Sequence, residues 1–139
     1  MIILDTNVVS AFMRVAPDQA LLNWADRQPS LSLWTTSITV LEILFGIQIL
    51  PAGRRRELMT KSFEILLESK IEGRIASFDP TAARCAAELM AVRRAKGRPV
   101  ELKDTMIAGI VVAARATLAT RNTSDFEGLS VPVINPWKD

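Results

Sequence analysis

The stretch Met1-Ile-Ile-Leu-Asp-Thr-Asn7 decides the fold, because a short apolar strand runs directly into a carboxylate, a hydroxyl and an amide. A strand this apolar is typical of a parallel sheet that is covered on both faces. In open α/β sheets, ligands bind at the carboxyl ends of the parallel strands. The sequence therefore places Asp5 at the ligand-binding edge of a sheet, in surroundings made mostly of hydrocarbon.

The rest of the chain alternates short apolar runs with segments of helical spacing. Strands are expected at Ile2–Leu4, Leu31–Thr35, Arg74–Phe78, Thr117–Thr120 and Val131–Ile134. Helices are expected at Pro17–Gln28, from an N-cap at Ser37 to near Leu50, at Arg55–Ser69, from Pro80 (after the cap Asp79) to near Lys96, and at Leu102–Arg115. Strands separated by helices form parallel sheets. We expect one α/β domain over residues 1–139, a three-layer α/β/α fold whose central parallel sheet has about five short strands.

Composition narrows the class of protein. A chain of 139 residues with 49% hydrophobic and 23% charged residues can bury a core of its own, as soluble globular proteins do. No apolar run is long enough to span a bilayer, and the first residues lack the basic region of a signal peptide. Cys85 is the single cysteine, which fits a reducing cytoplasm. We therefore expect a cytoplasmic protein without a membrane partner.

The chain contains no histidine and no tyrosine. This absence excludes Ser-His-Asp and Cys-His triads, histidine-based cleavage of RNA and zinc sites with histidine ligands. Catalysis must depend on carboxylates, hydroxyls, lysine, arginine or a bound metal. Oxygen-rich sites favour Mg²⁺ or Mn²⁺.

Several further polar side chains stand where the α/β layout can bring them to the same edge as Asp5. Glu42 interrupts a helix that is apolar almost all round and is expected to be largely buried, so it needs a metal, a hydrogen bond or a salt bridge to another helix. Asp104 lies in the first turn of a helix, where acids also favour the helix dipole. Asn122 and Asp125 follow a strand in a segment rich in ordinary turn residues. A divalent cation would explain why carboxylates gather at one edge.

Basic residues are clustered although the net charge is only +2. One cluster is Arg54-Arg55-Arg56, and another is Arg93-Arg94-Ala-Lys96-Gly-Arg98 at a helix end. Such clusters are consistent with contacts to phosphate groups. They are equally consistent with a solvated helix start and with compensation of a helix dipole.

Four elements resemble the PIN-domain family, specifically the VapC/FitB-type toxins of bacterial toxin–antitoxin pairs. They are Leu4-Asp-Thr-Asn-Val8, Thr39-Val-Leu-Glu42, Asp104-Thr-Met-Ile-Ala108 and Thr120-Arg-Asn-Thr-Ser-Asp-Phe126, and the terminal Asn135-Pro-Trp137 is similar to the FitB subgroup. The resemblance covers essentially the whole chain. It implies a Mg²⁺- or Mn²⁺-dependent endoribonuclease that commonly dimerises and is silenced by a small DNA-binding antitoxin, forming a hetero-oligomer.

The residue roles below are those that the resemblance implies. The catalytic and metal-binding acids are Asp5, Glu42, Asp104 and Asp125, with Thr6, Asn7, Thr120 and Asn122 as supporting polar groups. The fourth acid falls in the family at the position of either Asn122 or Asp125, and only Asp125 is charged here. Metal-activated water would hydrolyse RNA, and the expected RNA-backbone contacts are Arg54, Arg55 and Arg121.

Two rival functions remain compatible with these residues. One is a metal-dependent phosphatase or nucleotide hydrolase, which also uses aspartates at strand ends. Asn7 disfavours it, because aspartyl-phosphate enzymes usually carry a second aspartate two residues after the first. The other is a catalytically weak domain that serves as a partner-binding module, against which the presence of all four acids argues.

Overall fold

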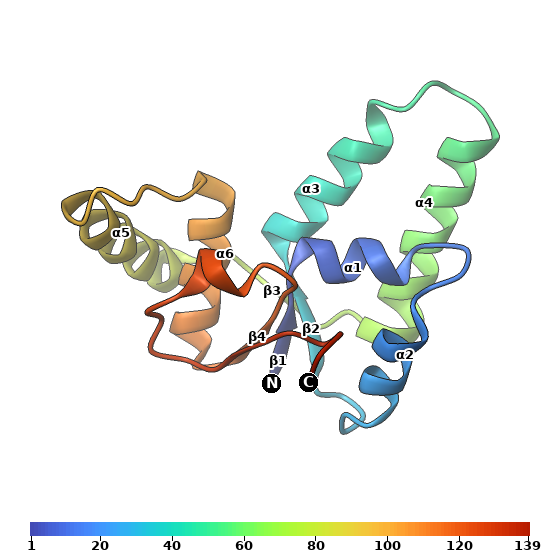
Figure 1. Cartoon of the computed structure of the whole chain (residues 1–139). Coiled ribbons are helices and arrows are strands. Elements are labelled where there is room, and N and C mark those ends of the chain that lie inside the picture. The colour runs from blue at the N-terminus through green and yellow to red at the C-terminus, as the bar shows by residue number, and fades with distance from the viewer.

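In the computed structural model, which describes residues 1–139, β1 (Ile2–Leu4) is the central strand of a five-stranded sheet. β2 (Leu33–Thr36) and β4 (Thr117–Ala119) flank it, and β3 (Ile75–Ala76) and β5 (Val133–Ile134) form the two edges. Every pairing is parallel. The predicted parallel sheet is confirmed. Because all its strands run in the same direction, their carboxyl ends lie along the same end of the sheet (Figure 1).

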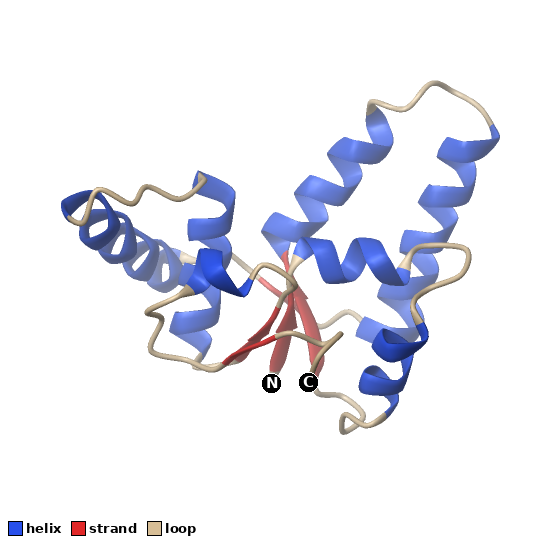
Figure 2. Ribbon diagram, viewed as in Figure 1, coloured by secondary structure: helices blue, strands red, loops and turns tan.

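Helices cover both faces of this sheet, as the three-layer prediction requires (Figures 1 and 2). α1 (Thr6–Phe12), α2 (Gln19–Asp26), α3 (Ser37–Gln48) and α4 (Arg54–Leu66) lie toward one side, and α5 (Pro80–Ala95) and α6 (Leu102–Ala114) toward the other. A π-helical turn, η1 (Leu67–Ile71), continues α4, and a 3-10 turn, η2 (Thr123–Phe126), follows β4. None of these helices combines the length and the apolar character that a membrane crossing demands.

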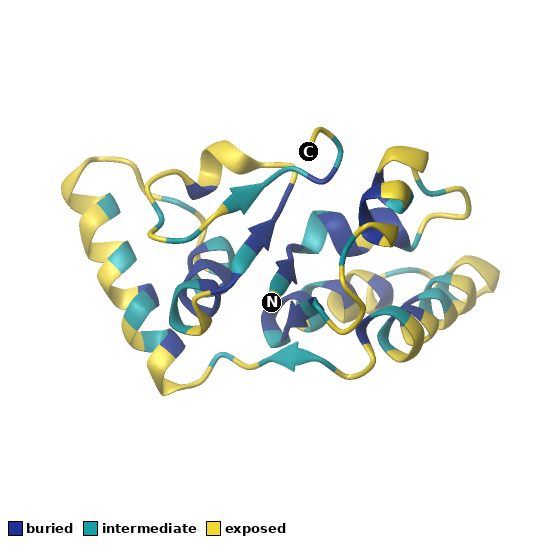
Figure 3. Cartoon of the chain, turned by 90° about the horizontal axis from the view of Figure 1, so that it is seen from below, coloured by how far each residue is buried: buried dark blue, intermediate teal, exposed yellow.

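Two apolar cores lie on opposite faces of the sheet. Successive strand residues point to opposite faces, and accordingly Ile3 packs in the core beneath α5 and α6, whereas Leu4 packs in the core beneath α1, α2 and α4. Both side chains are fully buried. Figure 3 shows buried residues concentrated in the central strands and on the inward faces of the helices, whereas β3 and β5 are intermediate. β1 is thus anchored from both sides immediately before Asp5.

The helix caps fit the predictions in part. Asp79 caps α5 by accepting a hydrogen bond from the backbone N–H of Ala82 (2.8 Å), and Pro80 is the first helical residue, as expected. The cap of α3 was predicted one residue too late, because Thr36 accepts the N–H of Thr39 (3.0 Å). The predicted cap Ser37 instead accepts the backbone N–H of Phe78 (3.1 Å).

Other element bounds differ from the prediction by a few residues. The expected helix at Pro17 begins at Gln19 after the cap Asp18, and the expected strand at Leu31 begins at Leu33, since Leu31 itself has a positive φ. The short helix α1 was not predicted. Its seven residues are too few to show a clear hydrophobic period, and Asp5 caps it by accepting the N–H of Thr6.

The prediction that α3 is largely buried was wrong. Ile43 and Ile47 are buried, but Leu41, Leu44 and Phe45 are exposed to 56%, 43% and 60%. Glu42 is accordingly half-buried rather than buried. α3 thus has one apolar face that packs in the core and another that no part of this chain covers.

Candidate acidic active site

Asp5 lies at the carboxyl end of the central strand and is only 3% exposed. Its Oδ1 accepts the backbone N–H of Thr6 (2.8 Å), and its Oδ2 accepts the Thr120 hydroxyl (2.8 Å) and the Asn7 amide (3.1 Å). Burial raises the pKa of Asp5, as does the charge of Glu42 to a smaller extent, while these hydrogen bonds act in the opposite direction. The side chain is therefore held in one orientation without any cationic partner.

Thr120 and Asn7 make a closed set of bonds around Asp5. Because the Thr120 hydroxyl donates its single proton to Asp5, its oxygen is free to accept from the Asn7 amide (3.2 Å) and from the backbone N–H of Asn122 (3.1 Å). Asn7 in turn accepts the backbone N–H of Arg121 (3.1 Å) through Oδ1. The predicted polar residues thus connect β1 to the loop after β4.

Glu42 is reached through a chain of hydroxyl groups. Thr6 donates to Glu42 Oε1 (2.8 Å) and lies 3.0 Å from the Thr39 hydroxyl, which receives a further bond from Thr36 (3.3 Å). With one proton per hydroxyl, the chain is consistent when Thr36 donates to Thr39, Thr39 to Thr6 and Thr6 to Glu42. The alternative of a salt bridge from Glu42 to another helix is not observed, because no cation pairs with it.

Asp104 lies in the first turn of α6, and its electrostatic environment connects it to the other acids. The pKa of Asp104 is raised from 3.8 to about 6, most strongly by burial and then, in decreasing order, by the charges of Asp5, Glu101, Glu42 and Asp125. Three of these four neighbours are the other predicted site acids. Asp104 therefore shares one repulsive field with them, in addition to any favourable effect of the helix dipole.

Asp125 is exposed on η2, and its backbone is tied to the layer of α5 and α6, in whose core Phe126 of η2 is buried. Arg93 of α5 donates through Nη2 to the carbonyl oxygen of Asp125 (3.1 Å) and through Nη1 to the Thr105 hydroxyl (3.3 Å). Thr105 directly follows Asp104. Arg93 thus fixes the loop that carries Asp125 against the helix that carries Asp104. Asn122 bonds through its backbone alone: its N–H donates to Thr120, and its carbonyl oxygen accepts the N–H of Asp125 (3.1 Å).

The predicted RNA-contacting arginines have different surroundings. Arg55, from the start of α4, lines a hollow together with Thr6, Glu42 and Gly46, so it shares this hollow with one of the four acids. Arg54 is exposed and does not line that hollow, and Arg121 is exposed beside Asn7. Their contacts with RNA stay predictions.

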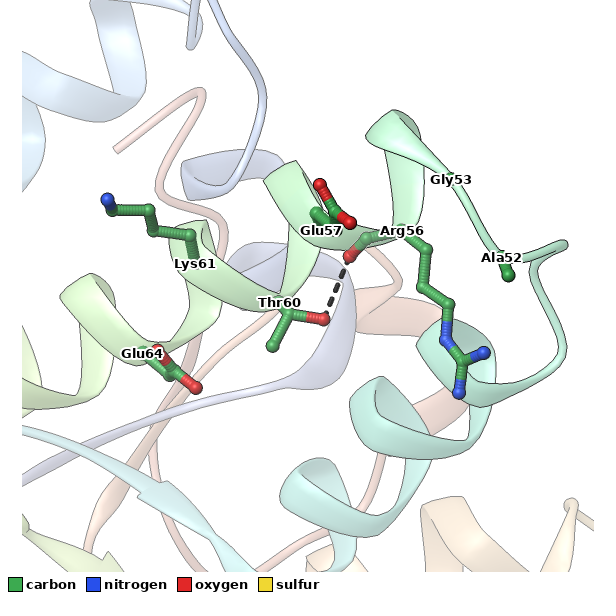
Figure 4. Close-up of a pocket in the computed structure, with 7 residues that line it drawn as sticks. All are labelled: Ala52, Gly53, Arg56, Glu57, Thr60, Lys61 and Glu64. Atoms are coloured by element: carbon green, nitrogen blue, oxygen red, sulfur yellow. Dashed lines mark hydrogen bonds between the residues drawn. The ribbon is translucent and has the colours of Figure 1, made fainter.

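A second hollow, on the outer side of α4, is unrelated to the acids. Figure 4 shows its lining by Ala52, Gly53, Arg56, Glu57, Thr60, Lys61 and Glu64, none of which belongs to the predicted site. Thr60 donates to the carbonyl oxygen of Arg56 (2.8 Å), and the Arg56 guanidinium binds Gln48 (2.6 Å). The hollow is open and carries both charge signs, so it does not resemble a site for an anionic substrate.

The chemistry of the acids fits a hydrated divalent cation. All available donors are oxygens, and the two ion pairs of the molecule, Arg98–Glu127 and Lys103–Glu101, involve none of the four acids. However, no group of three or more carboxylates or thiols is arranged to hold an ion by itself. This arrangement suits Mg²⁺, which usually retains several waters and contacts one or two carboxylates. The predicted metal set of Asp5, Glu42, Asp104 and Asp125 stays a prediction.

Sequence reasoning missed three supporting residues. Thr36 and Thr39 orient Thr6 and hence Glu42, and Arg93 holds the Asp125 loop. The run Thr35-Thr-Ser-Ile-Thr39 at a strand end was an available signal, because it repeats the polar character of the segment after β1. Nothing local to Arg93 indicates its role.

Comparison with known proteins identifies the family. The PIN domain model matches residues 2–130, which is nearly the whole chain. The chain therefore belongs to the PIN-domain family, as the resemblance implied.

Relatives of full length show which branch of the family is involved. The chain is 41% identical to the plasmid stability protein StbB of Pseudomonas syringae pv. tomato and 40% identical to the VapC ribonuclease Y4jK of Sinorhizobium fredii, in each case over 99% of both proteins. A solved structure of FitAB bound to an IR36 DNA fragment has a chain that is 31% identical and superposes with a TM-score of 0.87, covering 99% of this chain and 96% of the other. The protein is thus of the VapC/FitB type.

Proposed function

We propose that this protein is a metal-dependent endoribonuclease that acts as the toxin of a toxin–antitoxin pair. The observation that carries the proposal is the environment of Asp5, which is 3% exposed, fixed by three donors and free of any cationic partner. A buried carboxylate beside other carboxylates is costly unless a cation neutralises it. Membership of the VapC/FitB type supports the choice of RNA as the substrate.

The residues that would hold the metal are Asp5, Glu42 and Asp104, directly or through waters, with Asp125 completing the site or orienting water. A bound Mg²⁺ or Mn²⁺ supplies charge neutralisation at a phosphate and lowers the pKa of water. The protein contributes rigidity, since the hydrogen bonds to Asp5 and the hydroxyl chain to Glu42 fix two acids before any ligand arrives.

Hydrolysis itself forms one bond and breaks one. The oxygen of a water attacks the phosphorus opposite the 3′ oxygen, the bond from phosphorus to that 3′ oxygen breaks, and the 3′ oxygen takes up a proton. The products are 5′-phosphate and 3′-hydroxyl ends. Asp125, which is exposed on η2, is the acid that would orient the attacking water and accept its proton. Arg55 and Arg121 contact the RNA backbone rather than the bases.

The partners proposed are a second copy of the chain and a DNA-binding antitoxin. The exposed apolar residues of α3 support a protein partner, because apolar side chains gathered on one helix face commonly mark interfaces. The FitAB complex on DNA supports an assembly that includes an antitoxin. An RNA substrate and the lone reduced Cys85 support a place in the cytoplasm.

The test is cleavage of an internally labelled RNA by purified, antitoxin-free protein, with Mn²⁺ or with EDTA. We expect cleavage with Mn²⁺, none with EDTA, and none by Asp5→Asn. Robust cleavage in EDTA would contradict the proposal, because the chain offers no histidine as an alternative base. Hydrolysis of a small phosphate ester in place of RNA would favour the phosphatase alternative. Inactivity on both, by folded protein, would favour a partner-binding module.

A further inference from the structure

The chain ends in a compact turn that follows the edge strand β5. Asn135 organises this turn: its Oδ1 accepts the N–H of Trp137 (2.9 Å), its carbonyl oxygen accepts the N–H groups of Lys138 and Asp139, and its own N–H donates to Asp139 Oδ2 (2.7 Å). Trp137 is partly buried and packs against the core beneath α1 and α2. The indole is therefore held in a defined place beside the sheet.

Arg121 stacks on this indole. Its guanidinium carbon lies 3.8 Å from the centre of the Trp137 ring. The backbone of Arg121 is equally fixed, since its N–H donates to Asn7, which in turn donates to Asp5. One residue, Arg121, thus touches both the active-site network and the C-terminal turn.

The guanidinium of Arg121 has no polar partner in the protein. It forms neither an ion pair nor a side-chain hydrogen bond, although the buried carboxylate of Asp5 is one hydrogen-bonded residue away. An arginine beside repelling carboxylates would ordinarily pair with one of them. Such a pair would compete directly with a divalent cation. Stacking on an indole stabilises the cation and leaves the N–H edge of the guanidinium free.

The indole N–H of Trp137 makes no hydrogen bond, so hydrogen bonding does not explain the presence of a tryptophan here. Its Nε1 is buried and has no acceptor. A buried donor without an acceptor destabilises the folded state. The useful property of this side chain is consequently its aromatic face, which phenylalanine would preserve in part and an aliphatic residue would not.

We propose that Trp137 is a positioning residue that holds Arg121 at the rim of the acidic site, away from the carboxylates and with its N–H edge presented to an RNA phosphate. The inference rests on the proposed function and adds to it the role of the C-terminal turn. Asn135 and Pro136 contribute indirectly, because the turn that they form positions the indole that holds Arg121.

The experiment is a double-mutant cycle with Arg121→Ala, Trp137→Leu and the combined variant. Binding of a labelled oligouridine is measured in EDTA at several salt concentrations, and Mn²⁺-dependent cleavage is measured as kcat and KM. Loss of the Arg121 phosphate contact should weaken binding and reduce the salt dependence by about 0.7 in logarithmic slope. Trp137→Leu should weaken binding in the same direction, with a raised KM. In the Arg121→Ala background, Trp137→Leu should have no further effect, because Trp137 acts through Arg121.

Trp137→Phe is the matched control and should stay within about twofold of the wild type, since an aromatic face remains. Trp137→Met, which fills space without an aromatic face, replaces Trp137→Leu if the latter does not fold. An equal loss of binding from the Trp137 variant in both backgrounds would overturn the proposal, because it would indicate a purely structural role. So would unchanged binding and slope in Trp137→Leu or Trp137→Met. A wild type that binds RNA with this coupling but does not cleave it would refute the ribonuclease proposal and leave the positioning role standing.

Discussion

Asp104→Asn should make the metal-free protein more stable at neutral pH. The folded-state pKa of Asp104 is about 6, against 3.8 as its ordinary value. At about 1.4 kcal/mol for each pKa unit, the difference corresponds to at most about 3 kcal/mol of destabilisation when the group is ionised. Because the carboxyl is only partly buried, solvent screening reduces this to about 1–2 kcal/mol. The change also removes a favourable interaction with the α6 dipole of about 0.3–1 kcal/mol. The net gain is about 1 kcal/mol.

The sign of the pH dependence follows from the raised pKa. The folded state binds the Asp104 proton more tightly than the unfolded state does. The stability that this proton provides is therefore fully present in the wild type below pH 3.8, and it is lost as the pH rises through about 6. The two proteins should therefore have equal stability near pH 4. At pH 7.5 the free energy of unfolding of Asp104→Asn should exceed that of the wild type by about 1 kcal/mol. For a domain of this size, that is a rise in melting temperature of about 3–4 °C.

Urea unfolding in EDTA at a series of pH values measures this difference. The matched control is Asp26→Asn, which removes an exposed carboxylate outside the site and should unfold as the wild type does at each pH. If Asp104→Asn is less stable than the wild type at pH 7.5, Asp104 serves mainly the helix dipole. The shared repulsive field inferred for the site acids would then be wrong.

Three further predictions concern the metal, the packing and the Asp125 loop. Mn²⁺ at about a hundred times its dissociation constant should add about 2.7 kcal/mol, or about 8–11 °C by calorimetry, and Asp5→Asn should lose most of that shift. Gly109→Ala should destabilise by about 1–3 kcal/mol in urea, because the new Cβ would lie 2.6 Å from the Ala82 carbonyl oxygen and 2.8 Å from Ala86 Cβ; a stabilised variant would contradict this. Arg93→Ala should slow RNA cleavage by about tenfold to a hundredfold through the displaced Asp125 loop, and Arg93→Lys should not restore it, since lysine lacks the planar fork.

The sequence was informative where one strand end determines the site. The apolar run of β1 and the Asp5-Thr-Asn7 segment predict both the parallel sheet and the position of Asp5, because the carboxyl end of a buried strand allows few alternatives. The cap Asp79 with Pro80 is similarly local, and it was predicted to the residue. The family resemblance adds the other acids, which spacing alone does not bring together.

The environment of Glu42 was misjudged for a physical reason. An apolar helix indicates burial in general, but it does not tell whether the chain's own core or a partner covers each side. Leu41 and Phe45 are exposed on this chain, so the burial expected for Glu42 does not hold here.

Contacts between distant segments were beyond the reach of the sequence. Three such contacts join elements whose relative placement depends on the completed sheet. They are the Thr6–Glu42 bond, the Arg93–Asp125 bond and the Arg121–Trp137 stack. The sequence around Trp137 predicts a turn, but it does not predict that Arg121 stacks on the indole.

Binding of Mn²⁺ to metal-free protein, followed by the loss of the electron paramagnetic resonance signal of the free ion, tests the central claim most directly. The wild type and Asp26→Asn should bind with equal affinity, whereas Asp5→Asn and Asp104→Asn should each bind at least about tenfold more weakly. This result would establish that Asp5, which follows β1, and Asp104 of α6 act on one ion. Equal Mn²⁺ affinity in all four proteins would contradict the account, because Asp5 and Asp104 would then not belong to a shared metal site.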